Sequence, residues 1–167
     1  YNGGMIPINP VSDRTATARI ARIKVTLDDI KPTIWRRVEV PLTITLKALH
    51  EVVQAVMLFE NYHLFRFDVG ERGDERHYGI PDPHDDWIKI TDAGTVKLGK
   101  LVEADVKRFT YTYDFGDNWR HTVTIESRLL PDDSFNTWPV CIAGQTTTGA
   151  RVASKVAVNR SAERPDA

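Results

Sequence analysis

The stretch TLKALHEVVQAVMLF, residues 45–59, spaces its apolar residues three and four positions apart, whereas the segments around it alternate every second residue. The first spacing aligns apolar side chains along one side of a helix, and the second places them on one face of a strand. Thr45 predicts an N-cap for this helix through its hydroxyl. The sequence therefore predicts an amphipathic helix whose apolar side lies on a sheet.

Seven segments have the composition and alternation of strands. They are residues 22–27, 34–40, 63–69, 87–91, 95–102, 108–114 and 119–126. Two of these segments precede the helix, and the others follow it. This order is typical of an α+β fold with a mostly antiparallel sheet and one main amphipathic helix packed on it.

The length of 167 residues fits one domain, and no internal repeat is visible. Residues 1–18 are rich in Gly, Pro, Ser and Thr and predict a flexible tail. We expect the single α+β domain over residues 19–145. Residues 146–167 lack aromatic side chains and predict a poorly ordered tail, with RVASKVAV as its structured candidate.

The net charge of −1 gives no whole-molecule attraction to DNA or anionic lipid and leaves a local basic patch open. Cys141 is the one cysteine, which rules out an internal disulfide and favours a reducing compartment. No apolar run approaches the ~20 residues of a membrane helix, and the first residues lack a secretory leader. We expect a cytoplasmic protein without a membrane contact.

The stretch YTYDFGDNWRHTVTIES, residues 111–127, predicts a hairpin with a polar turn. Its aromatic residues alternate onto one face and form a wall that contains His121. Asp114, Asp117 and His121, together with His63 or His50, could converge on a metal ion or form an acid–base pair. The other interpretation is that the aspartates shape the turn, because the spacing matches no zinc or calcium motif.

The stretch IWRR offers a second candidate surface. Trp35 and Arg37 share one strand face and could stack on a base or bind a phosphate or carboxylate. Arg36 falls on the more apolar face with its neighbours Ile34 and Val38. The structural interpretation, in which the arginines pair with acids of the same chain, is favoured because the charge here is not clustered.

Two further residues have ordinary structural interpretations. His50 lies at the edge of the apolar side of the helix, where a histidine is usually a satisfied boundary residue. Cys141 has no marked histidine nearby and is interpreted as a buried thiol.

Several stretches occur here in a specific order: IKVTLDDIKPTIWRRVEVP, TLKALHEVVQAVM, HLFRFDVG, YG, YTYDFGDNWRH and WPVCIAG. Over about residues 22–144 the chain resembles the plasmid Ri open-reading-frame-three family, also known as the TnpR passenger proteins of insertion elements. The resemblance implies a small α+β protein of plasmids, transposable elements and bacterial chromosomes, with no settled activity. The family pattern falls on Trp35, Arg36, Arg37, His50, His63, Tyr113, Asp114, Phe115, Gly116, Asp117, Trp119, His121 and Cys141.

The residues and the resemblance together favour a non-catalytic binding or accessory module of a plasmid or mobile element, without a cofactor. Its partner is unknown and could be a protein or a nucleic acid of that element. The alternatives are a metal-assisted hydrolase and a nucleic-acid-binding protein that uses the Trp-Arg-Arg strand. The expected binding residues are Trp35, Arg36, Arg37, His63, Asp114, Asp117, Trp119 and His121.

Overall fold

The computed structural model describes residues 20–85, 87–130 and 139–145, and the backbone of 151–152 and 156–157. Its strands before residue 100 are β1 (Ile20–Leu27), β2 (Trp35–Pro41), β3 (Phe65–Val69), β4 (Arg76–Gly79) and β5 (Ile90–Asp92). The later strands are β6 (Arg108–Tyr113), β7 (Trp119–Leu129), β8 (Val140–Gln145), β9 (Arg151–Val152) and β10 (Val156–Ala157). The helices are α1 (Leu46–Met57) and α2 (Leu98–Glu103).

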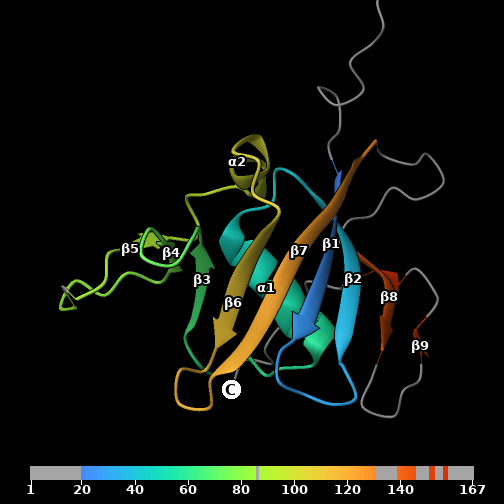
Figure 1. Cartoon of the computed structure of the whole chain (residues 1–167), viewed down its shortest axis with the longest axis horizontal. Helices are drawn as coiled ribbons and strands as arrows, with labels where there is room; N and C mark the ends of the chain where they lie inside the picture. The colour runs from blue at the N-terminus through green and yellow to red at the C-terminus, as the bar shows by residue number, and fades with distance from the viewer. Residues whose placement is uncertain (1–19, 86, 131–138, 146–150, 153–155, 158–167) are drawn as a thin grey trace, which may run out of the picture.

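The strands form one sheet in the order β10-β8-β2-β1-β7-β6-β3-β4-β5, with β9 paired to β8. The neighbouring strands are antiparallel except for β4 and β5, which run parallel. The sheet-dominated α+β fold is therefore confirmed. Figure 1 shows α1 crossing behind the sheet, while the front face of β1, β6 and β7 is uncovered in this view.

Helix α1 begins and ends as its sequence dictates. Thr45 caps the first turn, because its hydroxyl accepts a hydrogen bond from the backbone N–H of Ala48 at 3.1 Å. The buried face carries Leu46, Leu49 and Val53, which are fully enclosed. Leu58 ends the helix in the left-handed region with φ of 61°.

The core lies between α1 and the inner face of the sheet. Alternate residues of each central strand point inward, as in β1 with Ile23 and Val25 and in β3 with Phe65 and Phe67. Tyr111 of β6 completes an aromatic layer, with its ring centroid 5.0 Å from that of Phe67. The predicted alternation in these strands is therefore confirmed.

Arg36 is buried on the inner face, as the alternation predicts, and is 9% exposed. Its Nε donates to the carbonyl of Val56 in the last turn of α1 at 2.9 Å. Its Nη1 donates to the carbonyls of Trp35 and Gln145 at 2.9 and 2.8 Å. Gly144 leaves room for the aliphatic part of the Arg36 side chain, since a Cβ at position 144 would lie 2.7 Å from Arg36 Cδ. Arg36 therefore ties α1 to β2 and β8.

The predicted strand over residues 95–102 is wrong, because this segment contains helix α2. Leu98 and Leu101 are both buried, and their separation of three residues fits one side of a helix. The N–H of Gly99 donates to the carbonyl of Leu42 at 2.9 Å, which holds the first turn against the β2–α1 connection. A segment of eight residues is thus too short for its apolar spacing to distinguish a helix from a strand.

The predicted strand over residues 87–91 is only partly correct, since β5 begins at Ile90. Trp87 is 95% exposed and lies in the preceding loop, so the apolar residue that suggested a strand has no core to enter. Strand β7 also continues to Leu129, past the predicted end.

The predicted N-terminal tail, residues 1–18, lies outside the described residues. Most of the predicted C-terminal tail also lies outside them, but RVASKVAV contributes β9 and β10, which both pair with β8. Within the part of the chain that the structure describes, no helix has the length and apolarity to cross a membrane.

The neighbouring arginines of β2 provide a matched test of this architecture. We expect Arg36→Ala to lower the free energy of unfolding by about 2–4 kcal/mol, because buried carbonyls of α1 and β8 lose their donor. We expect Arg37→Ala to cost about 1 kcal/mol or less, because its ion pair with Glu126 lies at the surface. Urea unfolding of both variants measures the difference. Equal losses would contradict the role of Arg36.

Candidate functional site

Two connections meet at one end of strands β3, β6 and β7, and we call their surface the hairpin end. They are the α1–β3 connection, residues 58–64, and the β6–β7 turn, residues 114–118. The N–H of Asp114 donates to the carbonyl of Leu64 at 2.9 Å, directly beside the paired residues Phe65 and Tyr113. The Tyr113 hydroxyl also accepts from the N–H of Tyr62 at 2.9 Å. The two connections are therefore fixed to each other by hydrogen bonds.

Asp114 shapes the turn and also contacts a histidine. Its backbone is left-handed, with φ of 57°, and its Oδ1 accepts from the N–H groups of Gly116 and Asp117 at 3.0 and 3.4 Å. Its Oδ2 lies 3.4 Å from Nε2 of His63, whose side chain is about half exposed. The turn-shaping interpretation of Asp114 is thus supported, and the structure brings His63 and Asp114 together.

The other turn residues lie nearby in different environments. Asp117 is exposed at the tip of the turn, and Asn118 follows it with φ of 56°. Trp119 is half-buried, with its ring 6.2 Å from that of Phe59. These residues form the rim of the hairpin end.

His121 lies in the core and does not reach the turn. Its side chain is fully buried, its Nδ1 donates to the carbonyl of Trp119 at 3.0 Å, and Phe59 meets its ring edge-on. Its Nε2 has no hydrogen-bond partner among the described residues. Burial lowers the pKa of His121 from 6.5 to about 4, so the imidazole is neutral at pH 7. The predicted aromatic wall around His121 is confirmed, but its convergence with Asp114 and Asp117 is not seen.

A closed ring of hydrogen bonds lies beside this histidine, and we call it the His50 ring. The Gln54 amide donates to the Tyr111 hydroxyl at 2.9 Å, and that hydroxyl donates to Nδ1 of His50 at 2.7 Å. Nε2 of His50 donates to the side-chain oxygen of Asn61 at 2.7 Å. The Asn61 N–H donates to the Gln54 amide oxygen at 3.0 Å, which closes the ring. Helix α1, strand β6 and the α1–β3 connection are joined by these four bonds.

The His50 ring sets the electrostatics of its members. Burial lowers the pKa of His50 from 6.5 to about 4, against the opposing effect of the hydrogen bond that its Nε2 donates to Asn61. Burial raises the pKa of the Tyr111 hydroxyl above its usual range. Both groups are therefore neutral near pH 7. His50 is a satisfied core residue, as its position on the helix predicted, and it stacks on Phe65 with centroids 3.7 Å apart.

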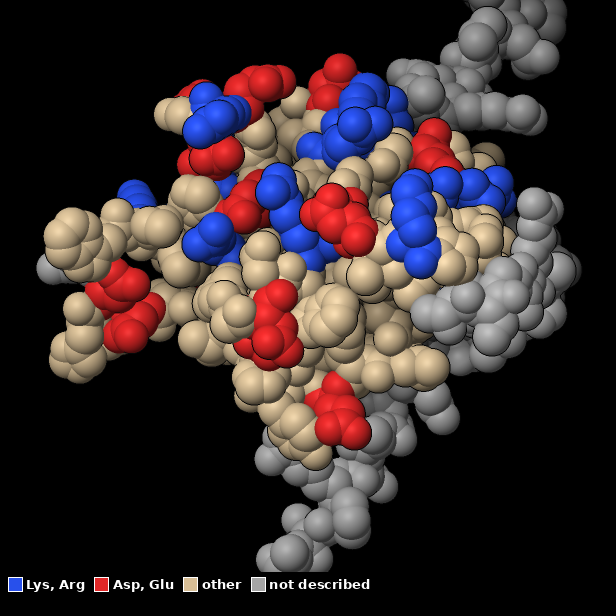
Figure 2. All heavy atoms as spheres, turned by 60° about the horizontal axis from the view of Figure 1, so that its bottom comes forward, with Lys and Arg blue, Asp and Glu red and all other residues tan. Residues whose placement is uncertain are grey.

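The hairpin end exposes large apolar side chains. Leu58 is 81% exposed, Tyr62 79%, Leu64 55% and Phe115 46%. Figure 2 brings this end forward and shows mainly uncharged atoms in its centre, with a few acidic side chains among them and Lys and Arg gathered above. Large apolar side chains exposed together on neighbouring connections are typical of binding sites.

Trp35 and Arg37 lie on the outer sheet face, away from the hairpin end. Arg37 forms two hydrogen bonds with the carboxylate of Glu126, at 2.6 and 2.8 Å, and its guanidinium lies 5.1 Å from the centre of the Trp35 ring. Lys24 Nζ approaches the same ring at 4.9 Å. The hydrogen bond with Glu126 raises the pKa of Arg37 and lowers that of Glu126. The structural interpretation, in which Arg37 pairs with an acid of the same chain, is supported.

The predicted binding residues thus separate into three places. His63, Asp114, Asp117 and Trp119 lie at the hairpin end, Trp35 and Arg37 lie on the outer sheet face, and Arg36 and His121 lie in the interior. Cys141 is buried, as predicted, and burial raises the pKa of its thiol.

Sequence reasoning missed Leu58 and Leu64 and named Phe115 only as part of the family pattern, because nothing in a linear pattern shows that two connections meet. The signal was present in NYHLF, residues 61–65, where aromatic and apolar residues fill a connection instead of Gly, Pro or Ser.

Among residues 20–85, 87–130 and 139–145 no group of three or more His, Cys, Asp or Glu side chains is arranged to hold a metal ion. The hairpin end can contact a partner through its exposed apolar side chains and through the polar groups of His63 and Asp114.

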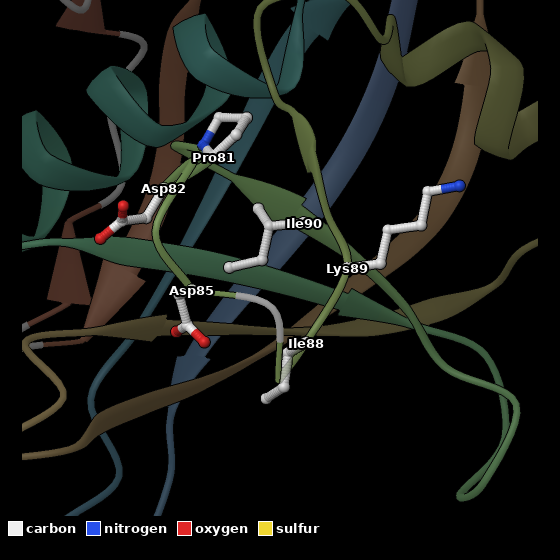
Figure 3. Close-up of a pocket in the computed structure, with 6 residues that line it drawn as sticks. All are labelled: Pro81, Asp82, Asp85, Ile88, Lys89 and Ile90. Carbon is white, nitrogen blue, oxygen red and sulfur yellow. The ribbon is translucent and has the colours of Figure 1, made fainter.

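A separate pocket of about 270 Å³ lies in the loop before β5 and is lined by Pro81, Asp82, Asp85, Ile88, Lys89 and Ile90 (Figure 3). Figure 3 shows both carboxylates on one side of the loop and Lys89 directed to the other. The carboxylates already accept hydrogen bonds, Asp82 from the N–H of His84 and Asp85 from the N–H of Trp87. These aspartates therefore build local turns.

Comparison with known proteins identifies the family. Residues 19–150 match the plasmid pRiA4b ORF-3-like proteins. The chain belongs to this family. The resemblance seen in the sequence is thus confirmed, whereas an association with insertion elements or the TnpR designation stays a prediction.

Relatives of this ORF-3-like protein extend the comparison. It is 44% identical over 116 residues to the uncharacterized protein y4hQ of Sinorhizobium fredii, a match that covers 68% of this chain and 56% of y4hQ. The chain therefore spans little more than half the length of that relative. The fold is similar to the crystal structure of MM3350, a protein of unknown function from Methanosarcina mazei, with a TM-score of 0.67 and 32% identity. That likeness covers 77% of this chain and 70% of MM3350.

The two buried histidines predict a pH dependence of stability. Their folded-state pKa of about 4 lies below the unfolded value of 6.5, so the unfolded chain binds more protons between these values. Full stability is present above pH 6.5 and is lost as the pH falls toward 4, by up to about 3 kcal/mol per histidine.

Urea unfolding at pH 7 and pH 5 measures this loss. We expect His121→Leu to reduce the difference between the two pH values by about half, whatever its effect on absolute stability. His84→Gln, in the exposed loop, is the matched control and leaves the difference unchanged. An unchanged difference in His121→Leu would show that the imidazole is not held neutral in the fold.

Proposed function

We propose that this ORF-3-like protein is a non-catalytic binding module that holds a protein partner at its hairpin end. The observation that supports this function is the exposure of Leu58, Tyr62, Leu64 and Phe115 on two connections that hydrogen bonds fix to each other. Exposing such side chains to water is unfavourable, and the fold does not require it because their neighbours Phe59 and Phe65 already enter the core.

The rigidity of the surface favours binding over a role as a mobile loop. Tyr113 holds the backbone of Tyr62 and His63, and the His50 ring holds Asn61. A surface that is already ordered loses little conformational entropy when a partner docks.

The charges at the hairpin end define the partner further. Glu60 and Asp117 are exposed at its margin, and Asp114 contributes a partly exposed carboxylate. Arg66 lies over the ring of Phe115 at 5.5 Å and pairs with Asp68 at 2.7 Å. The complementary partner is a protein surface with apolar side chains flanked by Lys or Arg.

The nucleic-acid alternative has weaker support. Arg36 is buried, Arg37 is paired with Glu126, and the faces of Trp35 are approached by Lys24 and Arg37. The hydrolase alternative is weakened by the enclosure of His121. The origin of the partner in a plasmid or mobile element remains part of the proposal.

Site-directed photo-crosslinking in the native host tests the proposed function. A photoreactive phenylalanine replaces Tyr62 or Phe115 in separate variants, and we expect both to capture the same protein. The matched control places the photoreactive residue at Thr124 on the outer sheet face, where we expect no capture of that protein.

A second variant checks that capture reports binding. Tyr62→Ser combined with Phe115→Ser removes exposed side chains, so the free energy of unfolding should change by about 0.5 kcal/mol or less per site. We expect affinity for the captured protein to fall at least tenfold, by about 1.4 kcal/mol or more. Capture from Thr124 alone, or unchanged affinity of the double variant, would overturn the proposed function.

A further inference from the structure

A pocket lies at the end of β3 opposite the hairpin end, and we call it the α2 pocket because α2 contributes to its lining. Figure 1 shows α2 near that end of β3. It has a volume of about 270 Å³. Its lining is Val69, Gly70, Asp74, Arg76, Tyr78, Val96, Lys100, Leu101, Ala104 and Val106. Most of these residues are apolar, so the pocket can hold a hydrocarbon group.

The fold explains the apolar wall of the α2 pocket. Val69 and Tyr78 lie on the inner face of the sheet, because Val69 points to the core and Tyr78 pairs with the buried Phe67. Leu101 comes from the buried side of α2. Val106 follows the helix and donates its N–H to the carbonyl of Leu101 at 3.0 Å, which fixes the wall.

Two cations line the same pocket. Arg76 opposes Val69 in the β3–β4 pair, so its side chain is on the pocket side of the sheet, and it is exposed. It has no carboxylate within ion-pair distance among the described residues. Lys100 pairs only loosely with Glu103, at 3.4 Å between largely exposed side chains. One carboxylate, Asp74, shares the lining, which leaves an excess of positive charge.

We propose that the α2 pocket binds a small carboxylic acid with a branched apolar body. The hydrocarbon group lies against Val69, Leu101 and Val106, and the carboxylate meets Arg76 and Lys100. A guanidinium matches the two oxygens of a carboxylate with parallel hydrogen bonds, which favours this anion over a spherical one. The pocket is smaller than those that hold drug-sized ligands, so the acid is small.

This inference is independent of the proposed function. The α2 pocket shares no residue with the hairpin end, and the two lie at opposite ends of β3. A variant that loses binding at one of these sites therefore still allows binding at the other to be measured.

A titration with 4-methylpentanoate, followed by NMR of backbone amides and methyl groups, tests the inference. We expect saturable shifts at Val69, Leu101 and Val106 with a Kd on the order of 1 mM, as befits a ligand of this size. The neutral isostere 4-methylpentanamide separates the contribution of charge, and we expect it to bind about tenfold more weakly.

Variants locate the binding site. Arg76→Gln should weaken binding of 4-methylpentanoate about tenfold, and Ala104→Trp should abolish it by filling the pocket. Arg120→Gln, an exposed arginine on the outer sheet face, is the matched control and should leave binding unchanged. Absence of saturable shifts, equal binding of acid and amide, or equal effects of Arg76→Gln and Arg120→Gln would each overturn the inference. Because Arg76 is exposed, its variant remains informative if Ala104→Trp fails to fold.

Discussion

The hydrogen-bond ring of His50, Gln54, Tyr111 and Asn61 is the interaction on which the arrangement of the hairpin end depends. Each bond contributes only about 1 kcal/mol net, but leaving a buried polar atom such as the Tyr111 hydroxyl without a partner costs about 1–3 kcal/mol. Together with the hydroxyl of Tyr113, which accepts from the N–H groups of Tyr62 and His63, the bonds of the ring position the α1–β3 connection.

The ring also explains why an aromatic core can contain two histidines. His50 is neutral and fully paired, so its burial requires no ion. His121 is neutral as well, but its Nε2 has no partner among the described residues. The two histidines therefore differ in their hydrogen bonds. His50 bonds Tyr111 and Asn61, which belong to other elements, whereas His121 bonds the carbonyl of Trp119 on its own strand.

Alternation allowed the central strands, the inward direction of Arg36 and the aromatic wall to be predicted, because a period of two residues depends only on the local chain. Helix α2 could not be predicted in this way, since its six residues contain too few turns to display a period. The candidate site was predicted in part for a related reason. Its turn residues are local, but the hydrogen bond between Leu64 and Asp114 depends on the pairing of β3 with β6, which no local pattern contains.

The polar residues of the family pattern do not all point to function. Arg36 donates to one carbonyl of α1 and one of β8, His50 completes the hydrogen-bond ring and Asp114 builds a turn, so each has a structural task that an apolar residue could not perform. The exposed apolar residues present the opposite case. Tyr62, Leu64 and Phe115 contribute little to the core, and water would favour polar side chains in their place. In this fold the exposed apolar residues, rather than the polar residues of the motif, are therefore the ones that packing and turn formation leave unexplained.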